Sequence, residues 1–302
     1  MRLGIDLGGT KIEIVALDDD GTVLVRERVP TPAGDYAGTI RAICGLTTGV
    51  EARFGRSGTV GIATPGALST KADVLKNSNS TVLNGKPLKR DLEAALGRPV
   101  RMENDANCLA LSEAVDGAAA GERVVFGVIL GTGGGGGLVV DQKVVTGRNR
   151  IAGEWGHNPL PWPRDDERPG RACYCGKSGC IETFLSGAGI SSDYHARTGQ
   201  KLAAHDIAEA AARGDAVASA ARAAYQDRLA RGLASVINIV DPDAVVLGGG
   251  LSNIDALYDG LLAQVARYAF SDLLETRIVR AQHGDSSGVR GAAWLWPVQK
   301  SG

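Results

Sequence analysis

Hydrophobic positions in the first half of the chain follow two periods, one typical of strands and one typical of helices. Residues 3–7 and 12–17 are apolar runs separated by a short glycine-containing turn, which predicts a β-hairpin. The other elements expected here are strands at 23–29, 59–63 and 100–103 and helices at 35–54, 88–96 and 106–115. This alternation of strands and helices predicts an α/β fold.

The opening pattern of strand, Gly/Thr turn and strand returns after residues 116–122, where the composition shifts to Gly and Ala. Strands are expected at 124–130 and 138–140, on either side of a glycine turn at 131–137. Further on, we expect long helices within 205–239, a strand at 244–247, a helix beginning near Asn253 and a final helix at 286–296. The weak internal repeat predicts two related α/β domains. We place them at 1–117, with 287–302 packing back on this domain, and at 118–286.

Charge and cysteine content narrow the class of protein. The chain has 33 Lys and Arg against 34 Asp and Glu, which gives no electrostatic reason to expect nucleic acid or an anionic membrane as partner. No apolar run reaches the ~18 residues of a membrane span, and the N-terminus has no apolar signal segment. Five cysteines, three of them clustered, fit a reducing cytoplasm better than a disulfide framework. We therefore expect a cytoplasmic protein.

The cysteine cluster has the spacing of a metal site. Cys173, Cys175 and Cys180 follow His157, and Cys₃His is the ligand set of a closed tetrahedral zinc site. Three buried cysteines and a core histidine would be the alternative, but the Cys-x-Cys-x₄-Cys pattern favours zinc. Glu154 and Glu182 flank these ligands. A structural zinc would therefore hold two carboxylates in place for a polar substrate.

Three glycine turns follow strands, at 8–11, 131–137 and 248–250. Such turns let backbone N–H groups approach an anion, because no Cβ blocks the way. Thr10 and Lys11 add a hydroxyl and a cation suited to phosphate, and Asp6 could hold Mg²⁺ directly or through waters. One such turn is more often a hairpin or a packing site, but three in one chain favour a nucleotide.

A polar pair, Asn104-Asp105, lies where a strand is expected to end and a helix to begin. An aspartate at this place is often only a helix N-cap. Together with Glu154, His157 and Glu182, however, the pair supplies the groups that a sugar needs. Carboxylates and an amide bind vicinal hydroxyls, and one carboxylate can take the proton of the attacking hydroxyl.

These motifs resemble, in the same order and over nearly the whole chain, those of the ROK family of sugar kinases and repressors. The segments that carry the resemblance are 6–11, 103–107, 130–133, 153–157, the cysteine set with Glu182, and 248–250. The family implies an actin/hexokinase-like (ribonuclease H-like) ATPase fold, in which two α/β domains hold a sugar and ATP in the interdomain cleft. We also expect a homodimer.

The resemblance also implies a role for each motif. Asp105 would be the catalytic base. Sugar would be bound by Asn79, Asn104, Asp105, Glu154, His157 and Glu182. His157 would offer one ring nitrogen to structural zinc, with Cys173, Cys175 and Cys180, and its other nitrogen to a sugar hydroxyl. Mg²⁺ would be held through water near Asp6. ATP would be bound by Gly4, Ile5, Asp6, Leu7, Gly8, Gly9, Thr10, Lys11, Gly131, Thr132, Gly133, Gly134, Gly135, Gly136, Gly137, Leu138, Gly249 and Gly250.

Residues 77–81, 158–163 and 282–287 look closest to the bacterial fructokinase/mannokinase branch. We therefore expect ATP-dependent phosphorylation of D-fructose at its 6-hydroxyl, with mannose second and no room for an acetamide group. Glucokinase, mannokinase and N-acetylhexosamine kinase are the alternatives within the family. A repressor would need an N-terminal helix-turn-helix, for which a strand starting at residue 2 leaves no place. A sugar sensor without catalysis is disfavoured by the presence of Asp105.

Overall fold

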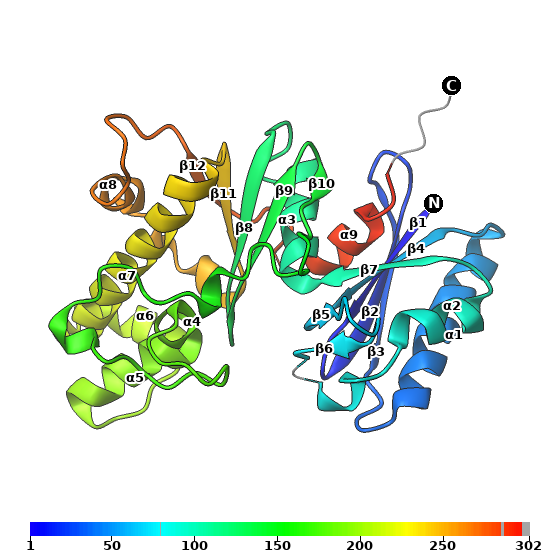
Figure 1. Ribbon diagram of the computed structural model, residues 1–302, viewed down its shortest axis with the longest axis horizontal. Coiled ribbons are helices and arrows are strands. Elements are labelled where there is room, and N and C mark those ends of the chain that lie inside the picture. The colour runs from blue at the N-terminus through cyan, green and yellow to red at the C-terminus, as the bar shows by residue number, and fades with distance from the viewer. Residues whose placement is uncertain (79, 285–286, 298–302) are drawn as a thin grey trace. The chain divides into compact units, whose positions relative to one another are not determined.

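The computed structural model describes residues 1–78, 80–284 and 287–297 (Figure 1). Internal contacts divide the chain into two compact units. Unit 1 comprises residues 1–121, 137–152 and 282 onward, and unit 2 comprises 122–136 and 153–281. The bounds differ from those expected from the sequence, because residues 137–152 and 282–284 belong to unit 1.

Unit 1 is built on a mixed sheet with strand order β3-β2-β1-β4-β7. These strands are β1 (Arg2–Leu7), β2 (Lys11–Leu17), β3 (Val23–Pro30), β4 (Thr59–Thr64) and β7 (Val100–Asn104). β1, β4 and β7 are parallel, whereas β2 is antiparallel to β1 and to β3. The three parallel strands therefore end at the same edge of the sheet, and Asp6 and Asn104 lie at that edge.

Helices α1 (Tyr36–Phe54), α2 (Leu88–Leu96), α3 (Asp105–Asp116) and α9 (Ser287–Trp294) pack on this sheet. α1 and α2 contact each other, and α9 packs against β1, β4 and α3 (Figure 1). The apolar side chains of β1 are fully buried between these layers. Gly4 allows the close approach of α9, since a Cβ there would overlap the carbonyl oxygen of Val289. A small antiparallel pair, β5 (Ala67–Leu68) and β6 (Leu75–Lys76), follows β4.

The second sheet has strand order β10-β9-β8-β11-β12. Its strands are β8 (Val124–Leu130), β9 (Gly134–Val140), β10 (Lys143–Val144), β11 (Ala244–Gly248) and β12 (Arg277–Arg280). The helices of unit 2 are α4 (Ile181–Leu185), α5 (Gly187–Thr198), α6 (Ala204–Ala212), α7 (Ala216–Val240) and α8 (Leu261–Ala266). The long helix α7 contacts each of the other four. Among the described residues, no helix combines the length and hydropathy that a membrane crossing requires.

Several elements of unit 2 differ from the sequence prediction. The helix expected near Asn253 is absent, because residues 250–253 and 255–257 form 3₁₀ turns and α8 begins at Leu261. Gly249 and Gly260 have φ of 82° and 66°. These left-handed residues flank the two 3₁₀ turns and prevent a continuous helix there. The sequence analysis also missed α4, α5 and β12. α4 has five residues, too few to display a helical period.

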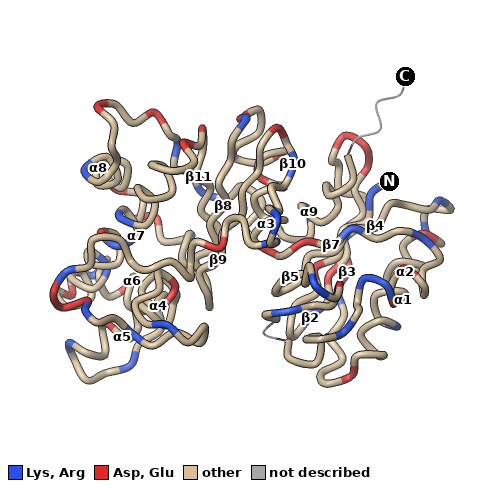
Figure 2. Tube along the Cα trace, in the orientation of Figure 1, with Lys and Arg blue, Asp and Glu red and all other residues tan. Residues whose placement is uncertain are grey.

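Acidic and basic residues are interspersed along each unit (Figure 2), and one group of them is buried in unit 2. Glu167 is 6% exposed, and its carboxylate accepts hydrogen bonds of 2.7 Å from both Arg228 and Arg231 of α7. Arg231 also donates to the carbonyl oxygens of Pro161 and Trp162. Burial acts to raise the pKa of Glu167, but the hydrogen bonds from the two arginines outweigh it and lower the pKa to about 2. The cluster thereby fastens the proline-containing segment 158–171 to α7.

Replacing Glu167 tests this role. Glu167→Gln should lower the free energy of unfolding at pH 7 by about 3–5 kcal/mol, because two buried guanidinium groups lose their carboxylate. The folded-state pKa is lowered from 4.5, so the stabilisation is present above about pH 4.5 and is lost as the pH falls toward 2. The difference between wild type and variant, measured by urea unfolding, should shrink over that range. Asp165→Asn, at a fully exposed neighbour, is the control; equal stability of wild type and Glu167→Gln at pH 7 would contradict the prediction.

Candidate active site

Acidic side chains meet at the strand-end edge of the unit 1 sheet. Asp6 of β1 lies opposite Glu13 of β2, and burial together with the negative charges of Asp105 and Glu13 raises the pKa of Asp6 to about 6. The positive charge of Lys11 acts to lower the pKa of Asp6. Asp6 and Asp105 are therefore close enough to interact electrostatically. Carboxylate oxygens are ligands that Mg²⁺ prefers in proteins, so the residues present fit this ion.

The turn between β1 and β2 is closed by a hydrogen bond of 3.0 Å from the Gly8 amide to the Lys11 carbonyl. Thr31 holds the turn from the side, since its hydroxyl donates to the Gly8 carbonyl at 2.8 Å. Gly9 and Thr10 at the tip are exposed. The segment thus presents its backbone and the Thr10 hydroxyl to solvent, next to the acidic edge.

At the start of α3, Asn104 caps the helix and Asp105 presents an exposed carboxylate. The Asn104 side chain is the helix cap, because its oxygen accepts from the Asn107 amide at 2.7 Å. Asp105 is the first residue of the helix, is exposed, and accepts from the adjacent Ala106 amide at 2.9 Å. The capping role that the sequence leaves open for Asp105 therefore belongs to Asn104. The carboxylate of Asp105 is presented at a helix N-terminus, where the backbone favours negative charge.

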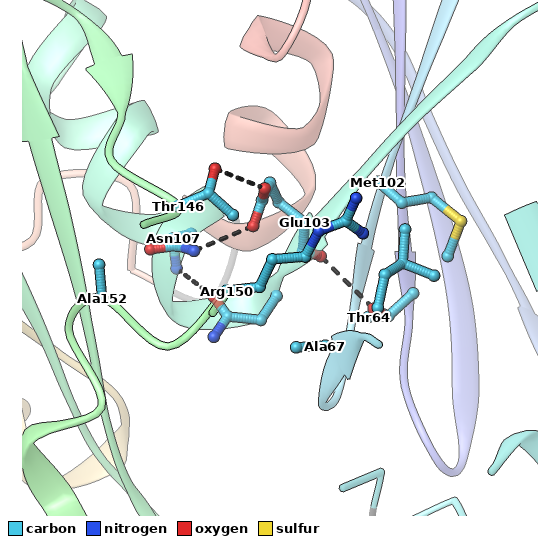
Figure 3. A pocket seen from close by; sticks show the side chains of 10 residues that line it. Thr64, Ala67, Met102, Glu103, Asn107, Thr146, Arg150 and Ala152 are labelled. Carbon is cyan, nitrogen blue, oxygen red and sulfur yellow. Dashed lines mark hydrogen bonds between the residues drawn. The ribbon is translucent and has the colours of Figure 1, made fainter. Parts of the chain in front are cut away.

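A small cavity, partly open to solvent, lies in unit 1 beside Asn104 (Figure 3). Glu103 is the centre of its polar wall and accepts hydrogen bonds from the Thr146 hydroxyl at 3.2 Å and from the Asn107 side-chain amide at 2.9 Å. The residues that line the cavity are Thr64, Ala67, Leu68, Met102, Glu103, Asn104, Asn107, Thr146, Arg150 and Ala152. Of these, the sequence analysis assigned a role to Asn104 alone.

In unit 2, the glycine run 131–137 is only partly a turn. Residues 131–133 form the turn, closed by a 3.0 Å hydrogen bond from the Gly131 amide to the Gly133 carbonyl, whereas the rest of the run lies in β9. A Cβ on Gly136 would overlap the carbonyl oxygen of Gly153, so packing requires this glycine. Glu182 of α4 accepts from the Gly134 amide at 2.8 Å. Glu182 is expected to bind the sugar, and one of its carboxylate oxygens thus already accepts a hydrogen bond from the first residue of β9.

The expected zinc ligands come together in unit 2. Ligand atoms of His157, Cys173, Cys175 and Cys180 all lie within 4.8 Å of one another. His157 Nδ1 is 3.6 Å from the Cys173 sulfur, and the sulfurs of Cys175 and Cys180 are 3.6 Å apart. Four such groups at these separations fit a tetrahedral zinc ion. Within this set, Nδ1 is the ring nitrogen that faces the cysteines.

The other nitrogen of His157 has a protein neighbour. Nε2 lies 2.9 Å from the hydroxyl of Tyr174, whose ring meets the imidazole edge-on at 5.1 Å. Burial, followed by the charges of Glu182, Cys173 and Glu154, raises the pKa of Tyr174 to about 12. Tyr174 is therefore a neighbour of the zinc ligands and lies within electrostatic range of the two carboxylates. The sequence analysis assigned no role to Tyr174. Its position between Cys173 and Cys175 could have suggested one.

Three of the residues expected to bind ATP lie in the interior of unit 1. Gly4, Ile5 and Leu7 are buried in the core around β1, and their contact with ATP stays a prediction. Gly249 turns the chain after β11, and Gly250 begins the following 3₁₀ turn. Asn79, expected to contact the sugar, lies outside the described residues.

Comparison with known proteins identifies the family. The profile of the ROK family matches residues 2–299. An N-acetyl-D-glucosamine kinase of Vibrio cholerae is 44% identical over 299 residues, which cover 98% of this chain and 99% of the relative. A ROK hexokinase structure from Thermus thermophilus has a TM-score of 0.87 at 33% identity and covers 97% of both chains. A Streptomyces griseus ROK glucokinase, in complex with glucose and AMPPNP, has a TM-score of 0.76 at 30% identity, covering 97% of this chain and 98% of the other.

The chain therefore belongs to the ROK family. Two expectations are confirmed, namely the hexokinase-like fold of two α/β domains and the class of ATP-dependent sugar kinase. The fructokinase branch is not confirmed, because the Vibrio cholerae relative is an N-acetyl-D-glucosamine kinase.

The metal site leads to a direct measurement. Purified protein should contain about one zinc ion per chain by elemental analysis. Cys175→Ser should lose the metal and weaken sugar binding together, because His157 is itself a ligand and Glu154 and Glu182 lie near the ligands in the sequence. Cys44→Ser, which is far from the cluster in sequence, should keep both the zinc and the affinity for the sugar. Unchanged sugar affinity in zinc-free protein would refute the coupling.

Proposed function

We propose that this protein transfers the γ-phosphoryl group of ATP to the 6-hydroxyl of N-acetyl-D-glucosamine. The observation that carries the substrate is the 44% identity to the N-acetyl-D-glucosamine kinase of Vibrio cholerae across 98% of this chain. This proposal adopts the N-acetylhexosamine alternative of the sequence analysis in place of fructose.

In the proposed reaction, Asp105 is the general base. Its exposed carboxylate at the start of α3 would accept the proton of the sugar hydroxyl as the oxygen attacks the γ-phosphorus. The bond between the γ-phosphorus and the bridging oxygen breaks, and ADP leaves with the electron pair. Catalysis of this type consists of positioning and charge stabilisation. Asp6, whose pKa is raised by burial and then by the neighbouring carboxylates, would hold Mg²⁺ through water, and this ion would offset phosphate charge when bound.

The remaining polar residues would bind the two substrates. Asn104 would use its side-chain amide donors for a sugar hydroxyl, because its oxygen is committed to the helix cap. Glu154 and Glu182 would accept from further hydroxyls. Nε2 of His157 would bind a sugar hydroxyl in place of the Tyr174 hydroxyl, and zinc would fix the orientation of the ring. The turns at 8–11 and 131–133 would offer amide groups to phosphate.

Asp105→Asn tests the base. The variant should keep its fold and its affinity for the sugar but lose roughly 10²–10⁴-fold in kcat, because the amide cannot accept the hydroxyl proton. Steady-state kinetics with an ADP-coupled assay, and sugar binding by calorimetry, measure the two effects. Asp20→Asn, at an exposed turn of the same unit, is the matched control. A kcat near that of the wild type would remove Asp105 from the mechanism.

A sugar panel tests the substrate. N-acetylglucosamine should have the highest kcat/KM among N-acetylglucosamine, glucose, mannose and fructose, by roughly tenfold or more over glucose. A site that hydrogen-bonds a substituent discriminates strongly against the analogue that lacks it, since buried polar groups are then left unpaired. If glucose or fructose exceeds N-acetylglucosamine by tenfold, the substrate assignment is wrong, although the kinase class stands.

A further inference from the structure

The cavity beside Asn104 contains a buried acceptor that the proposed phosphoryl transfer does not use. The side-chain oxygen of Asn107 is buried and has no hydrogen-bond partner in the protein, and Asn107 as a whole is 4% exposed. Leaving a buried acceptor unpaired is unfavourable, so a donor from a ligand or from water is expected at this place.

The orientation of Asn107 is determined by its neighbour. Its amide nitrogen donates to the Glu103 carboxylate at 2.9 Å, and the same carboxylate accepts from Thr146 (Figure 3). Turning the amide over would bring its oxygen against the carboxylate, which is repulsive. The oxygen of Asn107 therefore stays available as an acceptor.

A donor and apolar groups share this cavity. The Arg150 side chain extends across it (Figure 3) and is paired loosely, at 3.7 Å, with the exposed carboxylate of Asp73. Leu68 and Met102 are largely buried and supply an apolar lining, together with Ala67 and Ala152. The cavity thus combines one acceptor, one cationic donor and a surface suited to a methyl group.

This combination selects for a neutral group with both a donor and an acceptor. Glu103 and the Asn107 oxygen disfavour an anion, and Arg150 disfavours a cation. A secondary amide that ends in a methyl group satisfies all three features. We propose that the cavity binds the acetamido group of an N-acetylated hexose. Its N–H donates to Asn107, its carbonyl accepts from Arg150, and its methyl packs on Leu68 and Met102.

This inference rests on the proposed function and deepens it. Asn104 lines the same cavity and immediately precedes the proposed base, Asp105. An acetamido group held here would place the sugar ring next to that base.

Selectivity in paired variants tests the subsite. We would measure kcat/KM for N-acetylglucosamine and for glucose with wild type, Asn107→Leu and Arg150→Met. Each variant should lower the ratio of N-acetylglucosamine to glucose by about 10- to 100-fold, because one hydrogen bond to the acetamide is lost and its partner is left unpaired. Arg148→Ala, an exposed arginine of the same segment, should leave the ratio unchanged. N-formylglucosamine, which lacks only the methyl, should fall roughly three- to fivefold below N-acetylglucosamine in the wild type.

The outcomes separate the two proposals. If the wild type prefers N-acetylglucosamine but Arg150→Met keeps the wild-type ratio, the subsite is wrong and the proposed function stands. If the wild type itself prefers glucose by tenfold, the proposed function fails and the subsite fails with it. Asn107 is buried, so its variant is assessed only if circular dichroism shows a native fold; Arg150, with a side chain 35% exposed, decides the question in either case.

Discussion

The hydrogen bond from the Asn107 amide to the Asn104 side chain determines where α3 begins, and the candidate residues of unit 1 depend on it. An uncapped helix start would leave backbone N–H groups unsatisfied, and a neighbouring carboxylate would be drawn in to satisfy them. Because Asn104 caps the helix, Asp105 is left exposed one residue later. Because Asn104 is the cap, Asp105 does not have to serve as the cap and can act in the proposed chemistry.

Glu103 organises the other side of the same strand end. Its two oxygens accept from Asn107 of α3 and from Thr146 in the segment that follows β10. It therefore joins two parts of unit 1 that are distant in sequence, and it orients Asn107 as an acceptor. Three consecutive residues, the last two of β7 and the first of α3, accordingly serve the cavity wall, the helix cap and the proposed proton transfer.

The parts predicted well from the sequence are those with long hydrophobic periods or strict spacing. The β1–β2 hairpin and α3 lie where their apolar patterns place them, and the Cys₃His spacing does bring four ligand atoms together. The five-residue α4 and the strand β12 carry too few residues for a period. The glycine run was misjudged because glycine serves close packing as well as turns, and Gly136 in β9 is required by packing. Arg150 went unnoticed because the cavity that it lines with Asn107 forms only on folding, and Tyr174 because its contact with His157 also forms only then.

Substrate choice is harder to predict than chemistry for an energetic reason. The kinase class depends on many groups that must all be present, and motifs along the whole chain report them. Discrimination between two hexoses depends on one or two hydrogen bonds, each worth ~1–3 kcal/mol when a buried partner is left unpaired. Asn107 lies in the quoted segment 103–107 but was given no role there, and Arg150 lies in none of the quoted segments. Among the residues that the structure describes, none from the stretches that suggested fructose lines the cavity. Selectivity is therefore to be sought in the side chains that share the cavity wall with the cap of α3.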